Sequence, residues 1–311
     1  MQYRALGNTG LNVSALSFGA SSLGSVFKPV DEGEGIRTVH AALDRGINLI
    51  DVSPYYGLTK AETVLGKALA SAPVTRDRYV LSSKAGRYGE NVFDFSEARI
   101  VRSVDESLAR LKTDYLDILH LHDIEYVPLG PIVEESIPAL QKLKRQGKIR
   151  FIGITGFPLK IFQTVLSQTS VDVIISYCHY ALNNNRLLEL LPLLQEKGVG
   201  LINASPISMG LLSRQGPPDW HPATEEIKQV CRQTAAYCQA RGADLPGLAI
   251  QYAVHNAQIP TTLVGTANPA NLARNIAWMD EPIDLDLFRE VQERLRPIHN
   301  QSWPVGLPEN N

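Results

Sequence analysis

The chain has few cysteines and none of the patterns in which cysteines usually do chemistry. Its 311 residues include three, Cys178, Cys231 and Cys238, with no CxxC pair among them. An odd, scattered set argues against a disulfide framework, and we expect the protein to work in the reducing cytoplasm. Cys231 and Cys238 lie seven residues apart on an expected helix, which favours a packing role for both.

A surplus of charge and a long apolar run are missing as well. The 30 basic and 32 acidic residues leave a net charge of −2, whereas proteins that bind nucleic acid regardless of sequence normally carry a basic surplus. The most apolar stretch, at 187–194, contains Glu189 and Pro192 and is far shorter than a membrane span. The first ten residues lack the apolar core of a signal peptide. We therefore expect neither nucleic acid nor a membrane as a partner.

The chain does contain a repeating pattern of a short apolar run, a break and a segment of helical period. The runs are nearly continuous in hydrophobicity rather than alternating, which is typical of parallel strands covered by helices on the outside. There are eight of them, at 14–19, 48–53, 79–85, 115–122, 149–155, 171–177, 198–205 and 261–265.

The segments between the runs carry helix signals. Ser96 is a candidate N-cap before an apolar stripe that ends at Leu111, and a similar stripe runs from Ile132 to Leu143. Eight strand–helix repeats predict one (β/α)8 TIM barrel over 1–311. We expect an N-terminal β-hairpin at 3–13, two helices at 224–241 and 246–256, and a C-terminal extension. The alternative, a doubly wound sheet, needs a GxGxxG spacing that the segment 18–25 lacks.

Polar residues stand where three consecutive strands end. Asp51 ends the second strand, Lys84 the third and His122 the fourth, while Tyr56 lies in the loop after the second. Each alone has an ordinary explanation, as a cap, a solvated charge or a satisfied polar group. Active sites of such barrels lie at the C-terminal ends of the strands, so the three together favour a catalytic site.

These four residues suit proton exchange with an alcohol or a carbonyl. A tyrosine has a pKa of about 10, and an ammonium roughly 4 Å away stabilises its phenolate by about 4 kcal/mol, or about three pKa units. We therefore expect Lys84 to bring Tyr56 into the working range of an acid–base catalyst, and Asp51 to keep Lys84 protonated. A neutral His122 would orient the reacting oxygen, and a hydride carrier would complete the reaction.

Sequence blocks around these residues resemble the aldo-keto reductases, which are NAD(P)-dependent (β/α)8-barrel oxidoreductases. The matching blocks are LGNTGLNVSALSFGASSLG (6–24), DVSPYYG (51–57), SSKAG (82–86), YLDILHLHD (115–123), GKIRFIGITGFP (147–158) and SPISMGLL (205–212). The resemblance implies that Tyr56, Lys84, Asp51 and His122 form the family's catalytic tetrad, with Tyr55 as a wall residue.

A narrower resemblance is to the branch of the family that oxidises sugars at C1, the L-galactose dehydrogenases and neighbouring aldose 1-dehydrogenases. It lies in the blocks 19–27, 135–156, 172–180, 209–223 and 302–306. It implies transfer of the C1 hydride of an aldose, L-galactose or a stereochemical relative, to NAD, giving the aldonolactone. Tyr56 would be the general base. The implied candidates for the sugar pocket are Tyr180, Trp220, His221 and Trp303.

The resemblance also implies a cofactor site. The segment 205–212 would wrap the pyrophosphate through backbone amides, and the segment 265–275 would hold the adenosine. The implied cofactor-binding residues are Thr155, Ser176, Ser205, Gly210, Leu212, Gly265, Thr266, Asn271 and Asn275. NADPH-preferring relatives carry Lys or Arg in the adenosine segment. Only Arg274 is basic here, so we expect NAD rather than NADP.

Two positions depart from the family pattern, and three other functions stay open. Gly156 stands where many members have the asparagine that binds the nicotinamide amide, and Ala204 where many have an aromatic residue stacked on its ring. The alternatives are an NADPH-dependent carbonyl reductase, a cofactor-binding regulatory subunit, and a metal-dependent hydrolase that uses the strand pair His120 and His122. We expect no metal, and a monomer.

Overall fold

The computed structural model describes residues 1–26 and 28–311, so Phe27, the last residue of the matching block 19–27, lies outside the described residues. Eight parallel strands close into a barrel in the order β10-β11-β12-β3-β4-β5-β8-β9. They are β3 (Leu16–Gly19), β4 (Leu49–Asp51), β5 (Val80–Ala85), β8 (Leu116–Leu121), β9 (Ile149–Gly156), β10 (Val173–Tyr177), β11 (Gly200–Ala204) and β12 (Thr261–Gly265). Every one of the eight apolar runs contributes a barrel strand, which confirms the predicted fold.

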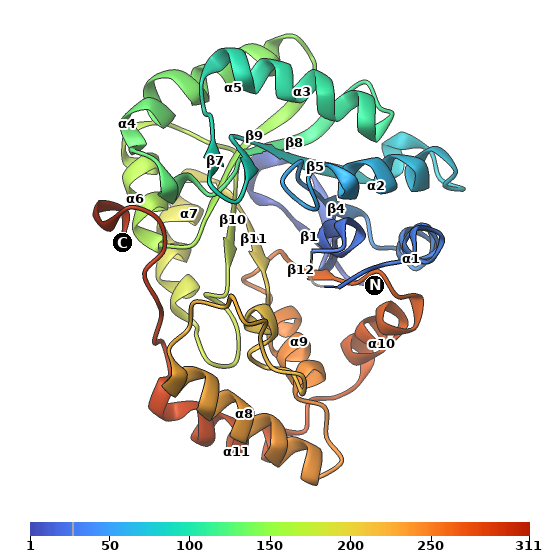
Figure 1. Ribbon diagram of the computed structural model, residues 1–311, viewed down its shortest axis with the longest axis vertical. Coiled ribbons are helices and arrows are strands. Elements are labelled where there is room, and N and C mark those ends of the chain that lie inside the picture. Colours follow the sequence, from blue (N-terminus) through green and yellow to red (C-terminus); the bar gives the residue numbers. More distant parts are fainter. Residues whose placement is uncertain (27) are drawn as a thin grey trace.

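Helices surround the barrel on the outside (Figure 1). They are α1 (Glu32–Asp44), α2 (Lys60–Ala70), α3 (Glu97–Leu111), α4 (Leu129–Pro131), α5 (Ile137–Arg145), α6 (Leu159–Gln168), α7 (Leu191–Lys197), α8 (Glu225–Ala240), α9 (Leu245–His255), α10 (Pro269–Asp280) and α11 (Leu285–Leu295). Ser96 caps α3 as predicted, because its hydroxyl accepts the Arg99 amide at 3.4 Å. The second stripe differs from one continuous α-helix: Ile132–Ser136 forms a π turn before α5, next to Pro138, which has no amide proton to donate.

The N-terminal hairpin lies against the N-terminal ends of the barrel strands. Its strands β1 (Tyr3–Ala5) and β2 (Asn12–Ser14) are antiparallel, as predicted. Leu6 is fully buried in the turn between them. The Asn8 amide donates to the Gly198 carbonyl at 2.8 Å, which fixes the turn to the loop before β11. The hairpin therefore closes the end of the barrel opposite to the predicted site.

The C-terminal ends of the strands open into the longer loops. A small hairpin, β6 (Arg87–Gly89) and β7 (Val92–Phe93), follows β5. The long interval between β11 and β12 holds a loop and then α8 and α9, as predicted. After β12 the chain forms α10 and α11, α11 packs against α8, and the last residues run back to the loop after β8 (Figure 1). Within residues 1–26 and 28–311, no helix combines the length and the apolar character that crossing a membrane requires.

Candidate active site

The charged core of the site is a buried ion pair between neighbouring strands. The Lys84 ammonium donates to the Asp51 carboxylate and, at 2.9 Å, to the Val52 carbonyl. Ser82 donates to the other Asp51 oxygen at 2.8 Å. Burial alone would lower the pKa of Lys84, but Asp51 and the Tyr56 phenol outweigh it and the pKa of Lys84 is raised. Lys84 therefore stays protonated, as expected from the sequence.

Tyr56 lies above this pair in the turn after β4. The Lys84 ammonium is 4.9 Å from the centre of the Tyr56 ring, and the His122 ring stands at 89° to it with centroids 5.6 Å apart. The turn is tight: a Cβ on Gly57, whose φ is +61°, would come within 2.1 Å of the Gly24 carbonyl oxygen. Only glycine fits this contact between the loops after β3 and β4, and that contact holds the phenol in place.

The prediction that the pKa of Tyr56 is lowered was wrong, because the pKa is raised. Burial raises the pKa of Tyr56, the Lys84 ammonium lowers it, and the carboxylates of Asp51 and Asp123 raise it again, so that it reaches about 12. The prediction from sequence took account of the ammonium alone. Burial and the two carboxylates depend on tertiary structure, and together they exceed the effect of Lys84.

His122 is a neutral hydrogen-bonding group, as expected. Burial lowers its pKa to about 3. Its Nδ1 lies 3.0 Å from the Ser53 hydroxyl, and that hydroxyl oxygen already accepts the Tyr55 amide at 3.1 Å. The Ser53 hydroxyl is therefore expected to donate its own proton to Nδ1 of His122. The proton of the neutral imidazole then lies on Nε2. Ser53 thus favours the tautomer in which Nε2 can donate to a substrate oxygen.

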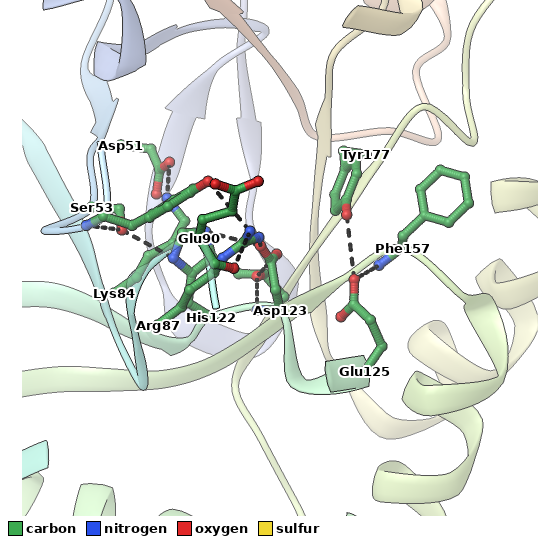
Figure 2. Close-up of polar contacts among 12 residues, drawn as sticks. Asp51, Ser53, Lys84, Arg87, Glu90, His122, Asp123, Glu125, Phe157 and Tyr177 are labelled. Atoms are coloured by element: carbon green, nitrogen blue, oxygen red, sulfur yellow. Dashed lines mark hydrogen bonds and ion pairs between the residues drawn. The ribbon is translucent and has the colours of Figure 1, made fainter. Parts of the chain in front are cut away.

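Two functional candidates beside His122 were missed at the sequence level. Asp123 directly follows His122, and its carboxylate accepts from Arg87 at 2.6 Å (Figure 2). The Arg87 guanidinium lies 4.2 Å from the centre of the Tyr55 ring. Asp123 stands in the block YLDILHLHD, yet nothing in that block indicates that the hairpin after β5 returns an arginine to it.

Glu125 explains the glycine that departs from the family pattern. A Cβ on Gly156 would come within 2.5 Å of a Glu125 carboxyl oxygen and 2.1 Å of Ile161. Glu125 accepts from the Phe157 amide at 3.0 Å and from the Tyr177 hydroxyl at 3.3 Å (Figure 2). Burial and the nearby Asp123 carboxylate raise the pKa of Glu125 well above its usual value. A neutral acid therefore occupies the space that a side chain at residue 156 would need.

The expected cofactor residues follow one another around half of the barrel rim. Strands β9, β10, β11 and β12 are neighbours in that order and carry Thr155, Ser176, Ser205 and Gly265 at or just beyond their ends. Thr266 follows β12, and Asn271 and Asn275 continue this arc along α10. The tetrad comes from the adjoining strands β4, β5 and β8. Residues of this chemistry and order fit an extended dinucleotide along the arc, with Thr155 nearest to His122.

The loop after β11 differs from the expectation in one respect. The amides of Gly210 and Leu212 both donate to the Ile207 carbonyl, at 3.1 and 3.2 Å. The Leu212 side chain is fully buried. These two amides therefore hold the turn and are not free to wrap a pyrophosphate in this conformation. Ser205 is half-buried with φ of +57° and remains the accessible candidate of this segment.

The structure brings three of the four expected sugar-pocket residues together. Trp303 stacks on Phe157 with centroids 5.0 Å apart and meets the edge of His221 at 4.9 Å. Trp220 is adjacent and 58% exposed. Tyr180 lies elsewhere: its ring stacks on Tyr252 at 4.9 Å, and its hydroxyl accepts from Asn256 at 2.9 Å. Its burial in the main core indicates a packing role.

A metal centre finds no support in the described residues, 1–26 and 28–311. They contain no group of three or more His, Cys, Asp or Glu side chains placed to hold a metal ion. His120 is fully buried beside Gly153, where a Cβ would come within 2.0 Å of its Nδ1. It lies inside the barrel, one layer below His122.

The closed barrel brings the expected catalytic and cofactor residues to one rim, as expected of a barrel oxidoreductase, and comparison with known proteins agrees on this class. The sequence model of the aldo/keto reductase family matches residues 15–296. The chain belongs to the aldo/keto reductase family, whose members use nicotinamide cofactors.

Two curated relatives and one solved structure make the likeness more specific. The chain is 51% identical to an L-galactose dehydrogenase of Arabidopsis thaliana, over 100% of this chain and 99% of that protein. It is 37% identical to a D-arabinose 1-dehydrogenase of Saccharomyces cerevisiae, over 96% and 95%. An aldo-keto reductase from Bacillus halodurans, solved in its holo form, superposes with a TM-score of 0.77 at 28% identity, covering 98% of both chains.

Proposed function

We propose that the protein is an NAD-dependent aldose 1-dehydrogenase that oxidises C1 of L-galactose or a close stereochemical relative to the aldonolactone. The observation that carries the proposal is the assembled tetrad of Tyr56, Lys84, Asp51 and His122 in a chain so similar to sugar dehydrogenases. A nicotinamide nucleotide, when bound, accepts a hydride.

The chain's own residues would handle the proton and the reacting oxygen. Tyr56 takes the proton of the C1 hydroxyl at its phenol oxygen, and the Lys84 ammonium stabilises the phenolate that this requires. His122, with its proton on Nε2, donates to the same C1 oxygen and orients it. Trp220, which is 58% exposed and lies against the buried His221 and Trp303, offers an aromatic face on which a sugar ring can pack.

A preference for NAD over NADP is supported by the charges around the start of α10. Arg274 is bound to Glu281 at 2.9 Å and lies 5.0 Å from the centre of the Trp278 ring, towards the C-terminal end of the helix. The Asn268 amide group donates to the carboxylate of Glu34 on α1. A negative charge at this position opposes a 2′-phosphate and suits a ribose hydroxyl.

Steady-state reduction of NAD and of NADP with a panel of aldoses tests the proposal. The panel is L-galactose, L-fucose, D-arabinose, L-gulose and D-glucose. We expect turnover with NAD and with L-galactose or a relative that shares most of its stereocentres. Reduction of simple aldehydes by NADPH with no oxidation of any aldose would instead identify a general carbonyl reductase and refute both the substrate and the cofactor.

A further inference from the structure

The Asp123 carboxylate lies beside His122, on the side of the imidazole ring that carries Nε2. Asp123 has φ of +54°, a left-handed conformation that ends the strand alternation. The side chain consequently turns back towards its neighbour, and one carboxylate oxygen is 3.6 Å from His122 Nε2. In the proposed reaction, this nitrogen donates a hydrogen bond to the reacting oxygen. The carboxylate is 9% exposed, and Figure 2 shows Asp123 next to His122 and Arg87.

Neighbouring groups fix this carboxylate in one position. Arg87 donates to one oxygen at 2.6 Å, and the Thr155 hydroxyl donates to the other at 3.2 Å. The Arg87 guanidinium is itself held, because it contacts the Tyr55 and Tyr126 rings at 4.2 and 5.0 Å. A carboxylate has about four lone-pair sites, so two donors leave it able to accept a further hydrogen bond.

A structural role alone accounts poorly for this ion pair. Buried ion pairs add little net stability compared with apolar packing. The Asp123 charge also raises the pKa of Tyr56 and so works against the catalytic base. A carboxylate that opposes the base and stands next to the reacting oxygen is better explained by recognition of the substrate.

We propose that Asp123, held by Arg87, is a specificity-determining residue that accepts a hydrogen bond from the hydroxyl on the carbon next to the reacting carbon. The inference rests on the proposed function. In a cyclic aldose C1 has two neighbours, the ring oxygen, which only accepts, and C2, whose hydroxyl donates. A carboxylate repels the former and binds the latter, so it determines which way round the sugar lies on His122 and Tyr56.

The proposal is tested by combining two changes. The C2 hydroxyl is removed from the substrate, and the Asp123 carboxylate is removed from the enzyme. L-Galactose is compared with its 2-deoxy analogue, and with L-fucose as the sugar deoxygenated elsewhere. For the unchanged protein we expect the 2-deoxy sugar to lose roughly 10- to 100-fold in kcat/KM, the usual range for a hydrogen bond to a charged group. In D123N this penalty should fall to a few-fold, while the penalty for L-fucose stays the same.

Two further variants separate recognition from folding. The double variant D123L/R87M replaces the ion pair by apolar side chains, a change that buried pairs often tolerate, and it should also lose the 2-deoxy penalty. The matched control is D117N, since Asp117 on β8, the strand that leads to Asp123, also binds two arginines, Arg76 and Arg150, at the opposite end of the barrel. D117N should keep the 2-deoxy penalty of the unchanged protein.

The test also separates failure of the inference from failure of the proposed function. If no aldose is oxidised, the proposed function fails, and the same ratio is then measured by reduction of lactaldehyde against propanal, which differ only in the neighbouring hydroxyl. The penalty is the ratio of kcat/KM with the neighbouring hydroxyl to kcat/KM without it. The role of Asp123 would be overturned if this ratio is near one in the unchanged protein. It would also be overturned if the ratio is the same in the unchanged protein and in the Asp123 variants.

Discussion

At the scale of single residues, the site is governed by burial as much as by charge. Tyr56 has a pKa of about 12 although an ammonium lies close to its ring, and His122 has a pKa of about 3 although a carboxylate follows it. In both cases removal from water disfavours the charged form and is the largest cause. The resting site is therefore a neutral phenol beside a neutral imidazole, the protonation state suited to donating hydrogen bonds to a carbonyl.

This protonation state predicts opposite pH behaviour for the two directions of the reaction. Oxidation needs the phenolate, whose fraction rises tenfold per pH unit below the pKa, so kcat/KM for the sugar should rise from about pH 6 to pH 9. A bound oxidised nicotinamide, being cationic, moves this rise to lower pH without removing it. Reduction needs the phenol and should stay nearly constant over that range. His122 should add no break, because its pKa is already far lower.

Replacing Lys84 provides the check on this assignment. Its charge lowers the pKa of Tyr56, so in K84M the rise for oxidation should move to higher pH and the rate at pH 7 should fall by roughly 10²- to 10⁴-fold. Steady-state rates across the pH range, with far-ultraviolet circular dichroism to confirm folding, measure both effects. An unmoved pH profile in K84M would contradict the role of Lys84.

At the scale of elements, the sequence indicated the strands and the tetrad well and the loop geometry poorly. Eight nearly continuous apolar runs, each followed by a segment of helical period, indicated buried parallel strands, and the barrel and the residues at its rim could be predicted from them. The tetrad could be predicted because Asp51, Lys84 and His122 lie at strand ends and Tyr56 lies in the short loop after one of them. Arg87 was not, since a short hairpin brings it to Asp123 from outside the motif. That the amides of Gly210 and Leu212 both donate to Ile207 was not predictable, because turn hydrogen bonds depend on the folded loop.

The start of α10 and its neighbour α1 allow a prediction about the cofactor. In the variant N271R/E34Q, a cation replaces a neutral side chain near the first turn of α10 and the opposing carboxylate is removed. We expect kcat/KM for NADP to rise by roughly 10- to 100-fold, the range of a hydrogen bond between charged groups, with a smaller loss for NAD. R274M is the matched control and should leave the NADP rate unchanged, because Arg274 is bound to Glu281. If kcat/KM for NADP increases in R274M and not in N271R/E34Q, the 2′-phosphate of NADP binds elsewhere.

At the scale of the whole molecule, the C-terminal tail joins the last helix to the middle of the chain. Asn310 donates to the carbonyls of Glu125 and Val127 at 2.9 and 3.0 Å, and the Leu307 amide donates to Glu125 at 2.8 Å. Trp303 packs on Phe157, directly after β9. The tail therefore braces the loop that follows Asp123, and its Trp303 also contacts His221 in the loop after β11.

Truncation after Asn300 should therefore separate sugar binding from cofactor binding. The truncated protein loses the buried Trp303 ring, a change that typically costs about 3–5 kcal/mol, so its melting temperature should fall by several degrees. We expect KM for the sugar to rise about tenfold or more, because Glu125 and its neighbour Asp123 lose their support, while the Kd for NAD changes little. Calorimetric titration with NAD and steady-state kinetics measure the two quantities separately.

The control is K160M, which removes only the exposed hydrogen bonds of Lys160 to the carbonyls of Glu309 and Asn311, and should resemble the unchanged protein. An equal loss of NAD and sugar affinity in the truncated protein would mean that the tail supports the whole rim rather than the substrate side.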